Sequence, residues 1–279
     1  MDSSVRIELF RAGIDRSTRL PSLKSTAKPA AAFKAGSLPS FERRRNEGLS
    51  LSAHKQIQLV RRHLLDMSKM AHRAVDYAIK GYKLGSPEFC RFVRRGDRQL
   101  NDLRRRITQL CQKLLLEEFV LNPEAMIEEV VLDCHVRFAI SALRITGALH
   151  AICTAAFEIA HHTMLLLEEF RTPACAALER TCHLVNRLMC LCIIALFKKE
   201  SGHAEAVLQN PDEQRLFDQA VHELRSSNHR PIAIPTALEL AIANSLRQIA
   251  KETREISEAV LFWLEGERFA LESRSTASR

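Results

Sequence analysis

Glycine, proline and aromatic residues are scarce in this chain. It contains nine glycines, nine prolines, one tryptophan and two tyrosines, and aromatic residues make up only 6% of it. Strand-rich domains draw on turn residues and aromatic side chains, so this scarcity favours helices over strands. Because 46% of the 279 residues are hydrophobic, there is ample material for a core. The composition therefore predicts an all-α fold.

Long hydrophobic runs are also missing. The longest uninterrupted apolar run, Leu188 to Phe197, has ten residues, which is half of the roughly twenty that a membrane-spanning helix needs. No apolar secretory segment lies near the start of the chain. We therefore expect a soluble, cytoplasmic protein with no transmembrane segment.

Recognisable catalytic and cofactor motifs are absent as well. None of the eight cysteines forms a C-x-x-C pair, which argues against zinc and thioredoxin-type sites. The cysteines lie in apolar helical patterns, as buried thiols do in a reducing compartment. No G-x-S-x-G, P-loop or dinucleotide-binding glycine pattern occurs. The sequence predicts no catalytic residue, no cofactor site and no enzymatic activity.

The positive charge is unevenly distributed. The formal net charge is +8, and residues 1–48 hold ten Lys and Arg against five Asp and Glu. This segment lacks any apolar period, so we expect a disordered basic tail. A second basic stretch, within the predicted helix 87–119, contains Arg94, Arg95, Arg98, Arg104, Arg105 and Arg106. The tail and this band leave a basic, nucleic-acid-associated helical protein as an alternative.

The clearest pattern is a long amphipathic stretch from Phe138 to Met164. Phe138, Ile145, Ile152 and Ile159 are spaced by seven, as in the seam of a helical bundle. The pattern returns 97 residues later, where Ile242, Ile249, Ile256 and Trp263 form the same row. The repeat indicates that one structural unit occurs twice.

Start and stop signals divide the remaining chain into helices. Ser86-Pro87-Glu88 and Asn210-Pro211-Asp212 each combine a capping side chain, a first-turn proline and an acid. We expect helices over about 50–84, 87–119, 122–171, 172–201, 203–226 and 235–265, with a kink or restart at Asn210-Pro211-Asp212. The predicted domains are a three-helix bundle over 49–171 and a second over 172–279.

Three segments in this order resemble the PhoU family, which is built from tandem three-helix bundles. VRRGDRQLNDL from Val93 to Leu103 is similar to the family's helix-two segment. FAISALRITGALHAICTAAFEIA, from residue 138 to residue 160, is similar to its third helix, and EISEAVLFWLEGE from Glu255 to Glu267 to its last. The resemblance covers about 50–266.

The PhoU resemblance implies a function. It implies a non-enzymatic regulator, a homodimer, that controls phosphate uptake and phosphate-starvation signalling. It would do so by contacting the ATPase of a phosphate ABC transporter and a membrane sensor kinase.

The resemblance also implies metal-binding acids spaced as E/D-x-x-x-D on the third helix of each bundle. Those positions hold His150 and Thr154 in the first repeat, and Arg247 and Lys251 in the second. A cluster of hard cations needs several carboxylates, and arginine and lysine would repel it. We therefore expect the family's metal cluster to be lost and no cofactor to be bound.

A second metal hypothesis arises from the residues alone. Glu158 and His161 stand one helical turn apart, the Glu-x-x-His spacing that di-iron bundles use. Such a site also needs a partner Glu-x-x-His and further carboxylates from facing helices. A metal-binding bundle centred on these two residues stays an alternative, against a polar helix face with no ligand.

Overall fold

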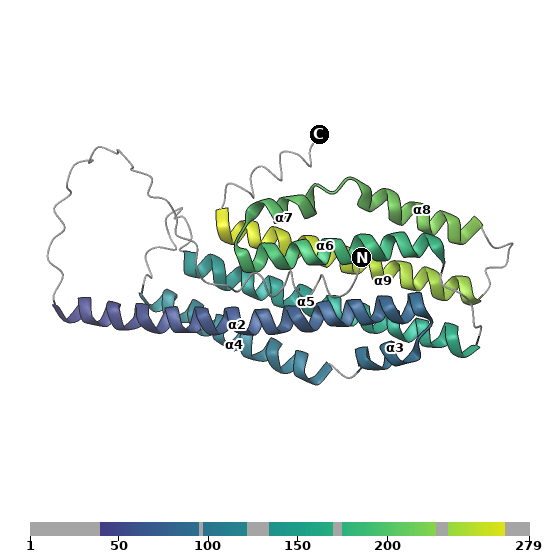
Figure 1. Ribbon diagram of the computed structural model, residues 1–279. Helices are drawn as coiled ribbons and strands as arrows, with labels where there is room; N and C mark the ends of the chain where they lie inside the picture. The colour runs from purple at the N-terminus through teal and green to yellow at the C-terminus, as the bar shows by residue number, and fades with distance from the viewer. Residues whose placement is uncertain (1–39, 95–96, 122–133, 170–174, 227–233, 266–279) are drawn as a thin grey trace, which may run out of the picture. The chain divides into compact units, whose positions relative to one another are not determined.

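Helices make up every regular element in the part of the chain that the structure describes. The computed structural model describes residues 40–94, 97–121, 134–169, 175–226 and 234–265 (Figure 1). Its helices are α2 (Ser40–Leu84), α3 (Pro87–Arg94), α4 (Asp97–Leu121), α5 (Cys134–Glu169), α6 (Ala176–Lys198), α7 (Ser201–Leu208), α8 (Asp212–Ser226) and α9 (Ile234–Glu265). The predicted all-α class is confirmed. Helix α2 begins within the segment 1–48 that we expected to be a tail, and residues 1–39 of that segment lie outside the description.

The centre of the compact unit Arg44–Arg279 is the pair α5 and α9, which pack along each other (Figure 1). They run antiparallel, because Arg144 binds Glu255 while Glu158, further along α5, binds Ser245, ten positions earlier on α9. The predicted seam is buried: Phe138, Ile145, Ile152 and Ile159 expose 3, 1, 0 and 1% of their surface.

Helices α2 and α6 complete the core. The Tyr82 hydroxyl at the end of α2 accepts a hydrogen bond from the backbone N–H of Cys175, next to α6, at 2.8 Å. The same hydroxyl donates to Glu239 of α9 at 3.4 Å. Further along, Nε2 of His72 on α2 lies 3.5 Å from Sγ of Cys190 on α6. These contacts join residues from both predicted repeats.

The outer helices follow the internal repeat closely. Helices α3 and α4 contact α5, whereas α7 and α8 contact α6 and α9. Helix α2 ends at Leu84 and α6 at Lys198, and α3 and α7 begin at Pro87 and Ser201, so each boundary recurs 114 residues later. The restart expected at Asn210-Pro211-Asp212 is present, since α7 ends at Leu208 and α8 begins at Asp212.

The predicted helix over 87–119 is interrupted at the equivalent place. Helix α3 ends at Arg94 and α4 begins at Asp97. The expected starts of the helices over 122–171 and 172–201 lie outside the described residues. The division into bundles over 49–171 and 172–279 remains a prediction.

Two of these helices are long and apolar enough to cross a membrane by length and composition. They are His135–Glu168 within α5 and Leu178–Lys198 within α6. More than half of the apolar window in each is buried inside the fold, at 61% and 56%. Core helices of soluble proteins pass the same test, and these two are core helices.

Candidate functional site

The first-repeat positions implied by the family resemblance lie between α4 and α5. Nε2 of His150 on α5 is 3.2 Å from Oδ1 of Asn101 on α4, and the tautomer with a proton on Nε2 donates this hydrogen bond. The Thr154 hydroxyl donates to the backbone carbonyl of His150 at 3.1 Å. An imidazole, an amide and a hydroxyl therefore occupy this face, and the contact joins the second and third helices of the repeat.

The second-repeat positions lie between α8 and α9. A guanidinium nitrogen of Arg247 on α9 donates to Oδ1 of Asp218 on α8 at 3.0 Å, and the guanidinium carbon is 5.4 Å from the centre of the Phe217 ring. Lys251, one turn further along, is exposed. Burial raises the pKa of the neighbouring Glu252 carboxyl, and the charge of Lys251 opposes part of that shift. The two positions thus present cations to the solvent and to Asp218.

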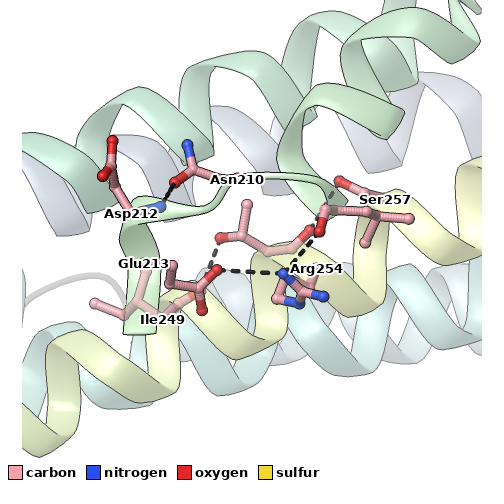
Figure 2. A network of polar contacts seen from close by, with 8 residues as sticks. Asn210, Asp212, Glu213, Ile249, Arg254 and Ser257 are labelled. Carbon is pink, nitrogen blue, oxygen red and sulfur yellow. Dashed lines mark hydrogen bonds and ion pairs between the residues drawn. The ribbon is translucent and has the colours of Figure 1, made fainter. Parts of the chain in front are cut away.

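An arginine that the sequence reasoning missed joins α9 to the break between α7 and α8. Nη1 of Arg254 donates to the carbonyl of Leu208, at the end of α7, at 3.1 Å and to Oε2 of Glu213, at the start of α8, at 3.4 Å (Figure 2). A cation at the carbonyl end of a helix also interacts favourably with the helix dipole. One guanidinium therefore holds both sides of the break.

The turn beside this guanidinium has its own hydrogen bond. Oδ1 of Asn210 accepts from the backbone N–H of Asp212 at 3.1 Å (Figure 2). This contact fits the capping signal that the sequence carries at Asn210. The sequence thus indicated the break, but it did not indicate the arginine 44 positions later that bridges it.

Glu158 and His161 are placed differently from a metal-binding pair. Oε2 of Glu158 accepts a hydrogen bond from the Ser245 hydroxyl of α9 at 3.0 Å. His161 is exposed, and its ring centre lies 5.7 Å from that of His162. Burial lowers the pKa of His162, and the nearby Glu158 charge opposes that shift. Within the described ranges, no group of three or more His, Cys, Asp and Glu side chains could hold a metal ion.

The residues at the family's metal positions do not fit a cluster of hard cations. In the second repeat, the carboxylates of Asp218 and Glu213 already accept hydrogen bonds from Arg247 and Arg254. A metal ion added there would face the guanidinium charge. In the first repeat, His150 and Thr154 supply no carboxylate oxygen.

Known proteins share both a domain and the fold with this chain. Residues 64–163 match the PhoU domain family. The crystal structure of PhoU from Pseudomonas aeruginosa is similar with a TM-score of 0.67 at 21% identity, covering 76% of this chain and 99% of that one. The phosphate transport system regulatory protein PhoU from Streptococcus pneumoniae is similar with a TM-score of 0.64 at 17% identity, covering 78% and 98%.

No curated protein matches this chain in sequence. The two structural matches, at these identities, establish the fold. Residues 64–163 therefore resemble a PhoU domain, and the chain has the fold of the PhoU structures.

Proposed function

We propose that this chain is a non-enzymatic regulator of phosphate uptake and phosphate-starvation signalling. The observation that carries the proposal is the PhoU-domain match at 64–163 within a fold that nearly the whole of two PhoU proteins shares. One of those proteins is described as a phosphate transport system regulatory protein. The regulator works in the cytoplasm as a homodimer.

The partners that follow from the family resemblance are the ATPase of a phosphate ABC transporter and a membrane sensor kinase. The chain acts on them through surface complementarity, because a helical bundle without catalytic groups can shift a partner between states only by binding one state more tightly. Arg98, Arg104, Arg105 and Arg106 are exposed on α4. Such a band accelerates encounters with acidic surfaces and makes them sensitive to salt.

We also propose that the family's metal cluster is lost in this chain. The support is chemical: Arg247 and Lys251 bring positive charge to its second-repeat positions, and His150 and Thr154 bring neutral groups to the first. The engagement of Asp218 by Arg247 leaves a protein cation bound to the available carboxylate. Regulation then depends on contact between proteins and requires no bound metal.

A capture experiment with the full-length chain tests the proposed partners. The tagged chain is recovered from phosphate-replete and phosphate-starved cells, and the bound proteins are identified by mass spectrometry. The transporter ATPase or the sensor kinase should be enriched in at least one state over a tag-only control. Recovery of neither protein in both states would contradict the assignment. Nucleic-acid binding that falls steeply with salt would favour the alternative instead.

A further inference from the structure

The two repeats differ at one place, which is the boundary between α3 and α4 in the first repeat and between α7 and α8 in the second. The shift of 97 residues that relates α5 to α9 places Phe157 where the second repeat has Arg254. Arg254 binds both sides of the break between α7 and α8. The ring of Phe157 has no polar hydrogen to donate, so the first repeat cannot make this bridge.

A hollow lies at the equivalent place in the first repeat. Its volume is about 210 Å³, and α2, α3, α4 and α5 all contribute to its wall. The wall is mainly apolar and includes Tyr77, Phe92, Leu100 and Phe157. An engineered apolar cavity of about 150 Å³ in another protein holds a benzene molecule, so a ring-sized side chain fits this volume.

An exposed aromatic side chain forms part of this wall. Phe92 on α3 is 56% exposed, and its ring centre lies 5.8 Å from that of Tyr77 on α2. A large apolar side chain left in water beside an apolar hollow gains free energy when a partner covers it. Aromatic residues next to a pocket are also the residues that contribute most to binding in protein interfaces.

An exposed arginine forms part of the wall of the hollow. Arg73 is part of the wall, is exposed, and donates to the carbonyl of Lys69 on its own helix at 3.3 Å. Arg91 on α3 and Arg98 on α4 are also exposed, but they are not part of the wall. No carboxylate in the described part of the chain forms an ion pair with any of these three arginines. The charge that complements Arg73 is negative.

We propose that the hollow is the docking site for an acidic segment of a protein partner. The segment inserts one aromatic or branched aliphatic side chain between Tyr77, Phe92 and Phe157, and its acidic side chains face Arg73. The inference rests on the proposed function for its premise that the chain acts by binding proteins. It adds the surface and the chemistry of the segment bound there.

Site-specific photocrosslinking with the full-length chain tests the proposal. The photoreactive amino acid p-benzoylphenylalanine replaces Phe92 in one variant and Leu116 in a control, because Leu116 is also apolar and 65% exposed but is not part of the hollow. Cells grown with and without phosphate are irradiated, and the crosslinked residue is mapped by mass spectrometry. Position 92, and not position 116, should crosslink to a segment with an aromatic or branched aliphatic residue and at least two acids within five positions.

Charge reversal provides the second readout. Arg73→Glu should lower the crosslinking yield from position 92 roughly tenfold. Arg62→Glu, at an exposed arginine of α2 outside the hollow, should leave the yield within about twofold, and thermal unfolding should show both variants folded.

Three results would overturn the docking site. The first is that position 92 crosslinks to no protein in either condition. The second is that the mapped segment has no acidic residue or belongs to a second copy of this chain. The third is that Arg73→Glu leaves the crosslinking yield unchanged. The identity of the partner judges the proposed function separately. A segment of the expected chemistry in a protein unrelated to phosphate transport would support the site and contradict the phosphate role.

Discussion

Lys199 adopts the same left-handed backbone conformation as Gly85, which stands 114 positions earlier in the chain. Their φ angles are 57° and 58°. Gly85 follows α2, where its N–H donates to the carbonyl of Tyr82 and the N–H of Ser86 donates to that of Gly81, the pairing of a Schellman motif. The two repeats therefore end their first helix in the same conformation, with glycine in one and lysine in the other.

Replacing Lys199 by glycine should stabilise the protein. A left-handed conformation costs a residue with a Cβ about 1–2 kcal/mol. The lysine offsets part of this cost, because its Nζ lies 5.7 Å from the centre of the Trp263 ring, a contact worth about 0.5 kcal/mol at an exposed site. Urea unfolding of Lys199→Gly should show a gain of about 0.5–1 kcal/mol. The matched change Gly85→Ala should lower the free energy of unfolding by about 1 kcal/mol or more. A Lys199→Gly variant less stable than the natural chain would contradict the account.

Gly81 permits the close approach of α3 to α2. A Cβ at this position would lie 2.5 Å from Sγ of the buried Cys90. Gly81→Ala should therefore lower the free energy of unfolding by about 1–3 kcal/mol through overpacking. Gly147→Ala is the control: apart from its own stretch of α5, nothing lies within 4 Å of a Cβ at this position, so it should gain about 0.5–1 kcal/mol of helix stability. Adding Cys90→Ala to Gly81→Ala should restore part of the loss, and additive effects would argue against the contact.

Glu239 should make stability depend on pH. Burial raises the pKa of its carboxyl, and the hydrogen bond from Tyr82 offsets part of that shift. Since the folded pKa lies above the unfolded value, protonation favours the folded state. The resulting stabilisation is complete below the usual carboxyl range and disappears as the pH rises through the folded pKa.

The variant Glu239→Gln tests this dependence. It should be more stable than the natural chain at pH 7, by less than about 1 kcal/mol because the carboxylate is only half-buried, and the gain should vanish near pH 4. Glu168→Gln, at an exposed position of α5, should change stability little at either pH. Denaturant midpoints at the two pH values measure the difference. A gain of equal size at both would contradict the role of the Glu239 carboxyl.

Arg254 should contribute more to stability than Arg247. The Arg254 guanidinium binds a backbone carbonyl and the Glu213 carboxylate, whose side chain is only 17% exposed. Arg254→Met should cost about 1–3 kcal/mol, because hydrogen bonds to charged groups are lost. The ion pair of Arg247 with Asp218 is exposed on both sides, so Arg247→Met should cost less than about 1 kcal/mol. Urea unfolding should separate the two variants, and equal losses would contradict the bridging role of Arg254.

The purified chain should carry no stoichiometric metal. Arg247, Lys251, His150 and Thr154 stand at the family's metal positions. Elemental analysis of protein purified without a chelator should find less than about 0.2 metal ions per chain. One or more ions per chain would contradict the proposed loss, and their removal by Glu158→Gln together with His161→Ala would assign them to the alternative site.

Local signals in the sequence predicted much of the fold. The seven-residue rows of Phe138 and Ile242 identified the two central helices, and Ser86-Pro87-Glu88 marked the boundary between α2 and α3. These features depend on residues that are close in the chain, and the type of each residue indicates its backbone preference. The restart after Asn210 was predicted for the same reason.

Features that depend on distant contacts were not predicted. The end of α6 was expected near residue 201, but the helix ends at Lys198, since a lysine in the left-handed conformation carries no local signal. The pairing of Arg254 with Leu208 and Glu213 joins residues 46 and 41 positions apart. The hollow depends on four helices at once. Periodicity identifies a buried face, but it does not give the register of the facing side chains.

Phosphate uptake in cells tests the central claim most directly. Cells of the source organism that lack this chain are compared with cells that carry the full-length chain. Both are grown in excess phosphate. Radiolabelled phosphate uptake should rise without the chain, because a negative regulator of the transporter is missing, and fall again when the full-length chain is restored. Uptake that is the same with and without the chain, in excess phosphate and in starvation, would contradict the proposed function.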